Sequence, residues 1–259
     1  MEVDHFYTAI LAVGPYVPGC LKFVWQARRI GQSAWTTLDT TLLPVLVWRW
    51  RSAGYFENRV VVVSAVGAEI APPITDPHLE VDFPTGSAIA ADFQVRKLAA
   101  RAWLMELSVS NEQKVREVGF WITLDTCPFP GDFAQNPIPA KQGNPVASNG
   151  SQGAPTIELR PKPPDSSENP PVDGCATYVV ASFHTHTPRT WLLPKGRPAP
   201  VGPSQQDVDA DNSVKIPGLV YDYSPVSGNA VPAGNPADSP AQLYVDTRGP
   251  ERRETPGRP

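Results

Sequence analysis

Apolar residues gather in short runs along the first third of this chain, and the composition of these runs predicts β-strands. Residues 43–50 and 60–66 are rich in valine, leucine and tryptophan, and residues 23–26 and 35–38 are shorter runs of the same kind. β-branched and aromatic side chains favour the half-buried, pleated surface of a sheet. We therefore expect residues 1–84 to form a β-rich N-terminal region, to which the pattern assigns no chemistry.

The period of the apolar positions then changes. Residues 86–109 repeat apolar positions at helical spacing, and Thr85 or Ser87 can cap the start of a helix there. The apolar runs at 116–124 and 177–183 again predict strands.

Proline-rich segments separate these elements. Proline lacks a backbone N–H and breaks helices, and most of the 31 prolines lie beyond residue 125. We expect loops at 125–154 and 161–174, with a short strand between them at 156–160. Residues 187–203 form a further proline-rich insert.

Pro203 and Ser204 fit the start of a helix, and a strand is expected within 214–223. The predicted fold class is α+β (α/β/α-like), with a central mixed β-sheet flanked by helices. The β-rich region at 1–84 precedes a domain at 85–224. Residues 225–259 are expected to be a flexible, proline-rich tail whose arginines face solvent.

Charge and hydropathy disfavour two classes of partner. The net charge of −4 does not favour binding to nucleic acid. The apolar run at 6–24 contains two prolines and two glycines, which makes it a poor membrane span. No basic segment precedes this run, so we expect no signal peptide and a protein that is cytoplasmic or secreted by a signal-peptide-independent route.

The three cysteines show no spacing typical of a metal site or a disulfide framework. Cys127 and Cys175 flank the same proline-rich segment and could pair, but we expect free, buried thiols.

Two of the four histidines, His184 and His186, end the predicted strand at 177–183. Side chains two residues apart on a strand point to the same side, about 6.5 Å apart, so both imidazoles can reach one zinc ion. Asp207 would be the third ligand and would leave a fourth position for water, as in catalytic zinc sites. Taken alone, the histidine pair fits a half-buried strand equally well.

Glu117 and Ser204 are candidates for the catalytic groups. Glu117 lies in an apolar strand, where an unpaired carboxylate is costly, and a carboxylate beside a metal can move a proton from water to a leaving group. The alternative is a glutamate that pairs with Arg116 or faces water. Ser204 could donate to a developing oxyanion, although Ser204 and Asp207 also match a capping box at a helix start.

The order of these motifs resembles the JAMM (MPN-plus, JAB-type) zinc metalloproteases. Glu117, His184-x-His186 and Ser204-x-x-Asp207 carry the resemblance, which covers roughly residues 86–223. Residues 111–119 and 182–186 are most similar to the JAB-like domains of bacterial toxins and related uncharacterised proteins.

The resemblance implies a sheet sandwiched by helices, with zinc bound by His184, His186 and Asp207. It implies that Glu117 is the general acid/base and that Ser204 stabilises the tetrahedral intermediate. One departure is the insert at 187–203, whose 17 residues exceed the corresponding segment of the family. Loop length adds little to the closure entropy, so we expect these residues to loop out without displacing the motif.

These observations predict a zinc-dependent hydrolase of amide bonds, a peptidase or isopeptidase, possible settings being a bacterial effector or toxin. Its substrate would be a protein or peptide, such as a ubiquitin-like modifier or a peptidoglycan peptide. The alternative is a non-catalytic interaction or scaffold module with the same JAB fold. A weaker alternative is a structural zinc in a β-rich binding protein, which would require a fourth protein ligand.

Overall fold

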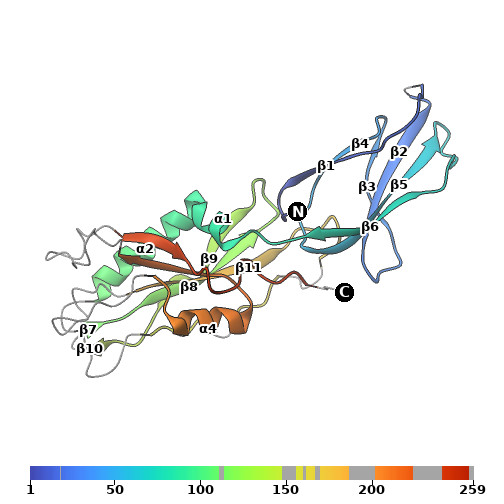
Figure 1. The fold of residues 1–259 in the computed structure, drawn as a ribbon. Coiled ribbons are helices and arrows are strands. Elements are labelled where there is room, and N and C mark those ends of the chain that lie inside the picture. Colours follow the sequence, from blue (N-terminus) through green and yellow to red (C-terminus); the bar gives the residue numbers. More distant parts are fainter. Residues whose placement is uncertain are drawn as a thin grey trace.

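The chain folds into two parts joined end to end, one made of strands and one of strands and helices (Figure 1). This computed structural model describes residues 1–17, 19–110, 114–147, 156–159, 162–166, 170–186, 202–223 and 241–256. Across these residues the fold is of the mixed α+β class, as the sequence predicts. None of the helices in the described ranges has the length and apolar character needed to cross a membrane.

Six strands make up the N-terminal part. They are β1 (Phe6–Ile10), β2 (Leu21–Arg29), β3 (Thr36–Thr41), β4 (Val45–Arg49), β5 (Gly54–Ser64) and β6 (Ile74–Val81). β2 alternates partly buried and fully buried residues along its length, as a strand with one face on a core should. β3, β2, β5 and β6 form one antiparallel sheet, and β1 pairs with β4. The expected β-rich character of this region agrees with these strands.

The second part is built on a five-stranded mixed sheet in the order β13-β12-β11-β8-β9. Its strands are β8 (Val118–Asp125), β9 (Asp132–Gln142), β11 (Thr177–Thr185), β12 (Gly218–Tyr223) and β13 (Ala241–Val245), and the short pair β7 (Lys114–Val115) and β10 (Val146–Ala147) lies beside it. β11 and β12 run parallel, and the other neighbours are antiparallel. β8 is buried along nearly its whole length, which is typical of a central strand covered on both faces.

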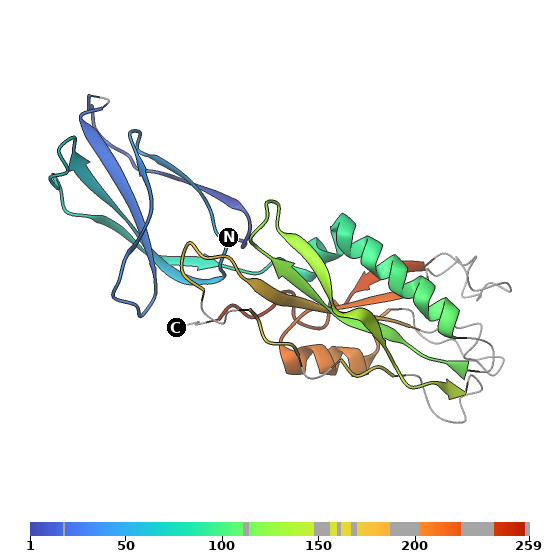
Figure 2. The same cartoon turned by 180° about the vertical axis from the view of Figure 1, so that it is seen from behind.

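Helices cover both faces of this sheet. α1 (Gly86–Ala91) and α2 (Phe93–Val109) lie on one face, and α4 (Gln205–Val214) lies on the other (Figure 2). The predicted helix at 86–109 is interrupted at Asp92, whose extended backbone ends α1 and whose carboxylate accepts hydrogen bonds from Gln94 N and Val95 N at the start of α2. Thr85 caps α1, as expected.

The loop predicted at 125–154 is wrong in its middle, where β9 pairs with β8. Pro137 and Pro139 lie within β9, and they are tolerated because β9 is the edge strand of the sheet. The register with β8 also shifts between Gly119 and Trp121, so a bulge in β9 accommodates these prolines. The short strand expected at 156–160 is absent from 156–159, where Leu159 O instead accepts a hydrogen bond from Trp121 Nε1 at 2.7 Å.

The expectation of a flexible tail is wrong for residues 241–256. β13 completes the sheet beside β12, and the chain after it returns toward the N-terminal part. The side chain of Arg253 is mostly buried and forms an ion pair with Asp165. Its guanidinium carbon lies 4.6 Å from the centroid of the Phe83 ring. Arg252 pairs with Asp82 at 3.2 Å. These arginines therefore hold the chain end onto the fold instead of facing solvent.

One hydrophobic cluster runs through both parts. Its buried residues include Trp50, Phe56 and Phe83 on the N-terminal side and Phe120 and Phe183 in the five-stranded sheet. A second cluster, of Phe23, Trp25, Leu46 and Val60, lies wholly within the N-terminal part.

Polar contacts reinforce this junction. Arg49 forms an ion pair with Asp4 and donates to Thr126 O at 3.0 Å and to Pro128 O. Arg29 Nε donates to Pro170 O at 3.2 Å.

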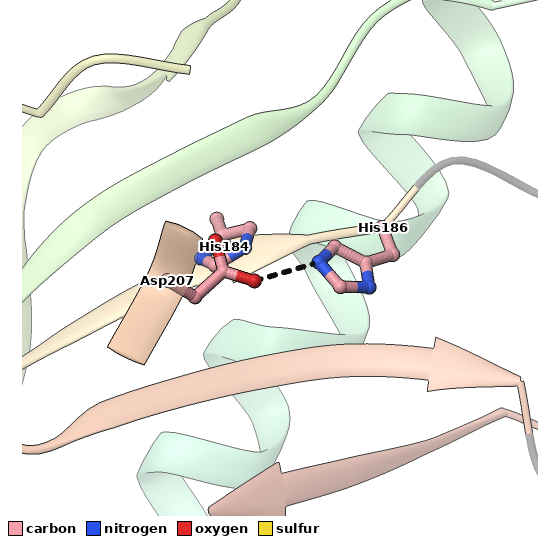
Figure 3. Close-up of side chains that lie close together, drawn as sticks. All are labelled: His184, His186 and Asp207. Atoms are coloured by element: carbon pink, nitrogen blue, oxygen red, sulfur yellow. Dashed lines mark hydrogen bonds and ion pairs between the residues drawn. The ribbon is translucent and has the colours of Figure 1, made fainter. Parts of the chain in front are cut away.

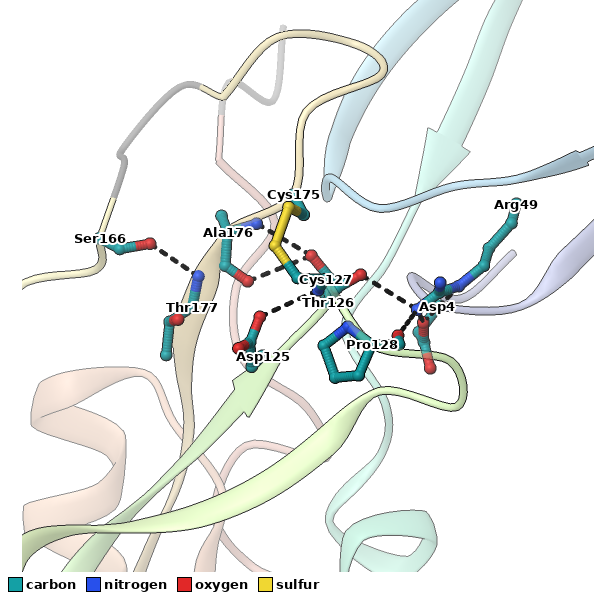
Figure 4. The surroundings of a disulfide bond; sticks show 10 residues. All are labelled: Asp4, Arg49, Asp125, Thr126, Cys127, Pro128, Ser166, Cys175, Ala176 and Thr177. Atoms are coloured by element: carbon teal, nitrogen blue, oxygen red, sulfur yellow. Dashed lines mark hydrogen bonds and ion pairs between the residues drawn. A yellow bond between two sulfur atoms is a disulfide. The ribbon is translucent and has the colours of Figure 1, made fainter.

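Cys127 and Cys175 form a disulfide, contrary to the expected free thiols (Figure 4). They are brought together because Thr126 and Ala176 exchange hydrogen bonds at the adjoining ends of β8 and β11. Cys20 is free and exposed.

Candidate metal centre

β11 delivers both histidines to the same place. Gly119 of β8 is the partner of His184 on one side, and Val220 of β12 is its partner on the other. His186 extends the parallel pairing by one residue, since its backbone N–H donates to Tyr221 O at 3.0 Å. The two imidazole rings lie with their centroids 5.1 Å apart. Both side chains are mostly buried, with 13% and 19% of their surface exposed.

Asp207 reaches the two histidines from the first turn of α4 (Figure 3). Its Oδ1 lies 3.3 Å from His184 Nε2, and its Oδ2 lies 3.3 Å from His186 Nε2. The same carboxylate accepts a hydrogen bond from Ser204 N at 2.6 Å, which completes the capping box. The capping and metal-ligand interpretations of this motif are therefore compatible in one geometry.

The donor set fits a zinc ion. One nitrogen or oxygen atom from each of His184, His186 and Asp207 lies within 4.8 Å of the others, and these three are the only such group among the described residues. Two ligand atoms bound to one zinc at tetrahedral angles are separated by about 3.3 Å, because Zn–N and Zn–O bonds are about 2.0–2.2 Å. Each histidine lies at this distance from one oxygen of the carboxylate, His184 from Oδ1 and His186 from Oδ2.

The electrostatics of this group also favour a cation. Burial alone would lower the pKa of His186, but hydrogen bonds with Asp207 and Asp222 outweigh it and raise the pKa to about 10. Burial would raise the pKa of Asp207, whereas its bonds with His184 and His186 hold that pKa well below its usual range. The carboxylates thus stabilise positive charge at the point where the Nε2 atoms converge.

Glu117 lies directly before β8, beside this group. Gly119 is the partner of His184 in the antiparallel pair of β8 and β11. Glu117 is two residues before Gly119 and His186 is two residues after His184, so the same register places Glu117 opposite His186. Burial raises the pKa of Glu117 to about 7, and the positive charge of His184 and His186 opposes the rise. A carboxyl group with this pKa can bind and release a proton near neutral pH.

Gly119 leaves no room for a side chain next to His184. A Cβ atom at this position would lie 2.7 Å from Phe183 O and 3.1 Å from His184 Cβ. The glycine of the Glu-x-Gly motif therefore permits the close approach of β8 to β11 that brings Glu117 to the histidines.

Ser204 is the N-cap of α4. Its Oγ accepts a hydrogen bond from Asp207 N at 3.3 Å, which leaves the hydroxyl hydrogen to serve as a donor. Arg248 Nη2 donates to Pro203 O at 2.6 Å and so fixes the chain just before the serine.

Four predicted site residues, His184, His186, Asp207 and Glu117, thus come together from three separate segments, with Ser204 at the adjacent helix start. Residues 187–201 lie outside the described part of the chain, so the looped-out insert stays a prediction. The separation of the two halves of the motif in sequence does not move Asp207 away from the histidines.

Sequence reasoning missed the acidic residues around the ligands. Asp222 on β12 lies 3.2 Å from His186 Nδ1 through its Oδ2. Asp211 on α4 accepts a hydrogen bond from Ser182 Oγ at 2.8 Å, and burial raises its pKa to about 6. Glu106 on α2 is fully buried, and burial raises its pKa well above the usual value. An aspartate inside the apolar run at 214–223 was the one available signal for Asp222.

Comparisons of this chain with protein-family models, with curated proteins and with solved structures gave no match.

Proposed function

We propose that this chain is a zinc-dependent hydrolase of amide bonds, acting as a peptidase or an isopeptidase. The observation that carries the proposal is the convergence of His184, His186 and Asp207, with the buried carboxyl group of Glu117 beside them. Three protein ligands are typical of a catalytic zinc centre, whereas a structural centre has four. Among the described residues, three gather at this point.

The resemblance to the JAMM metalloproteases adds support. The motif residues occur in the family's order, and they lie at the end of a strand and the start of a helix, as the resemblance implies. The mixed sheet with α2 on one face and α4 on the other is consistent with the sandwiched sheet expected of a JAB-like domain.

Each residue has a role in this chemistry. Zinc held by the three ligands would supply a Lewis acid that polarises the substrate carbonyl and activates water. Glu117 would take a proton from the attacking water and return it to the leaving amine, as its pKa of about 7 allows at neutral pH. The Ser204 hydroxyl would donate to the carbonyl oxygen as negative charge develops there, supported by the N-terminus of α4.

The substrate class is a protein or peptide. A ubiquitin-like modifier and a peptidoglycan peptide both present the amide bond that this chemistry cleaves, and a bacterial effector or toxin is the setting that the resemblance implies. The alternative is a non-catalytic scaffold module, which displacement of Asp207 by the insert would favour. The Asp207 carboxylate lies 3.3 Å from both histidines, which supports the enzyme instead.

The zinc content of the purified protein tests this proposal. We expect one zinc per chain by elemental analysis after exposure to zinc and removal of excess metal. His184→Ala and Asp207→Ala should each lose it, while His78→Ala, which removes an exposed histidine on β6, should keep it. A folded wild-type protein that retains no zinc after this treatment contradicts the proposal.

The role of Glu117 separates catalysis from metal binding. Glu117→Gln keeps the shape of the side chain but cannot move the proton. We expect this variant to bind one zinc per chain and to lose hydrolysis of a wild-type substrate by at least about 100-fold. Full activity in Glu117→Gln would remove this residue from the mechanism.

A further inference from the structure

Asp222 connects a metal ligand to a distant part of the chain. It lies on β12, the strand next to β11, and 2% of its side chain is exposed. One atom of its carboxylate, Oδ2, lies 3.2 Å from His186 Nδ1 and also accepts a hydrogen bond from Gly202 N at 2.9 Å. His186 and Gly202 are the described residues on either side of the segment 187–201.

The contact with Asp222 places a hydrogen on Nδ1 of His186. The Asp222 carboxylate accepts a hydrogen bond from the Gly202 N–H and is an acceptor toward the imidazole as well, so Nδ1 carries a hydrogen. The other ring nitrogen, Nε2, is the atom that faces Asp207. A histidine held in this way presents the lone pair of Nε2 to a metal, and such outer partners orient the ring and increase its basicity.

The backbone supports the same arrangement. The bond from His186 N to Tyr221 O aligns His186 with the residue before Asp222. Gly202 is buried and has a φ of +83°, a conformation that glycine adopts without strain. The chain then passes directly through Pro203 and Ser204 into α4, which carries Asp207.

We propose that Asp222 is a positioning residue of the metal centre, which orients His186 and fixes the return of the 187–201 segment at Gly202. This inference rests on the proposed zinc site. One carboxylate oxygen thus contacts the described residues on both sides of the segment, His186 and Gly202, and brings them close together.

Zinc affinity tests the proposal directly. We would measure the zinc dissociation constant by competition with a chromophoric chelator, for the wild-type protein and for Asp222→Ala and Asp222→Asn. Asp222→Ala loses both contacts and should bind zinc about 10–100-fold more weakly. Asp222→Asn keeps an oxygen acceptor and should lose less than Asp222→Ala.

Asp165→Asn is the matched control. The side chain of this aspartate is also largely buried and is paired with Arg253 and Val179 N, but it does not contact a candidate ligand. The control removes the same charge away from the site, so it should leave the zinc dissociation constant close to that of the wild type. Thermal unfolding of each variant confirms that it is folded.

Two spectroscopic measurements distinguish positioning from a merely structural role. Nitrogen NMR of His186 should show Nδ1 protonated in the zinc-loaded wild type, and the Gly202 amide should exchange faster with solvent in Asp222→Ala. A folded Asp222→Ala that binds zinc as tightly as wild type overturns this inference while leaving the proposed zinc site intact. A wild-type protein that binds no zinc overturns both.

Discussion

At the scale of single residues, the site is defined by how burial acts on acidic groups. Burial raises the pKa of Glu117 to about 7 and that of Asp211 to about 6, while histidine contacts keep the pKa of Asp207 low. The Asp207 carboxylate is thus ionised and able to bind a cation, while Glu117 is able to exchange a proton near neutral pH. Pairs of titratable groups whose pKa values are pushed apart are typical of catalytic sites.

The raised pKa of Glu117 predicts a pH dependence of stability. In the folded, metal-free protein this pKa is about 7, against about 4.5 in the unfolded chain. The folded state therefore holds a proton that the unfolded chain releases between these values, and the free energy of unfolding falls as the pH rises through this window.

Glu117→Gln removes this contribution. We would measure the free energy of unfolding of both proteins in urea. The value for the variant minus the value for the wild type should increase by roughly 1 kcal/mol per pH unit between pH 4.5 and 7. A difference between the two proteins that stays constant across these pH values would contradict the raised pKa.

The sequence predicts the residues of the candidate site, because their motifs are local. His184-x-His186 is set by the two-residue period of a strand, and Ser204-x-x-Asp207 by the geometry of a helix start. Asp222 and Gly202 were missed because their contact depends on which strand lies beside β11. The pairing of β11 with β12 is a long-range property that the local pattern does not encode.

At the scale of elements, the close pairing of β8 and β11 positions Glu117. Gly119→Ala places a Cβ atom against Phe183 O, a backbone atom that yields only if the strands separate. We expect this variant to lose about 1–3 kcal/mol of unfolding free energy and to bind zinc more weakly.

Gly14→Ala is the matched control for Gly119→Ala. A Cβ atom at Gly14 would meet no other atom within 4 Å, so its stability and zinc affinity should be close to those of the wild type. Equal stability of Gly119→Ala and Gly14→Ala would show that the close approach of β8 to β11 is not required.

The disulfide between Cys127 and Cys175 joins the ends of β8 and β11 away from the metal centre. The two cysteines are 48 residues apart in the sequence. Closing a loop of that size lowers the entropy of the unfolded chain and so stabilises the folded state by about 4 kcal/mol. Cys127→Ser/Cys175→Ser should therefore unfold at a clearly lower temperature than the wild type.

Cys20→Ser serves as the control, because Cys20 is free and exposed and its replacement should leave the unfolding temperature unchanged. If the double variant and the control unfold at the same temperature, the disulfide does not stabilise the fold. Disulfides are typical of proteins that work in oxidising compartments. Whether Cys127 and Cys175 are oxidised in the purified protein therefore bears on the compartment in which it works.

Most elements followed from the apolar pattern, and the failures have physical causes. The prolines of β9 predict a loop because they disfavour a strand, yet prolines are acceptable at a sheet edge. The proline-rich sequence around β13 predicts a tail, because the pairing of β13 with β12 is again non-local. The disulfide was missed because cysteine spacing does not encode spatial proximity.

At the scale of the whole molecule, the two parts share a buried cluster, although the N-terminal part also has a cluster of its own. Trp50 and Phe56 belong to the same buried cluster as Phe120 and Phe183, and Arg49 links β4 to the backbone at Thr126. The N-terminal strands are therefore part of the structure that supports the five-stranded sheet, although the sequence assigned them no chemistry.

This shared core predicts cooperative unfolding. We expect calorimetry of the full chain to show one transition, in which both parts lose structure together. A fragment lacking residues 1–84 would expose Tyr178, whose ring packs against that of Phe83, and should be less stable than the full chain. Two well-separated transitions in the full chain would contradict a common core.

The central claim is that His184, His186 and Asp207 bind a single zinc ion. A crystal structure of the zinc-exposed protein, with anomalous data on both sides of the zinc absorption edge, tests it most directly. We expect one strong anomalous peak within about 2.0–2.2 Å of the two Nε2 atoms and an Asp207 oxygen, with Glu117 nearby. A peak at other residues, or the absence of a peak between these three side chains, would contradict it.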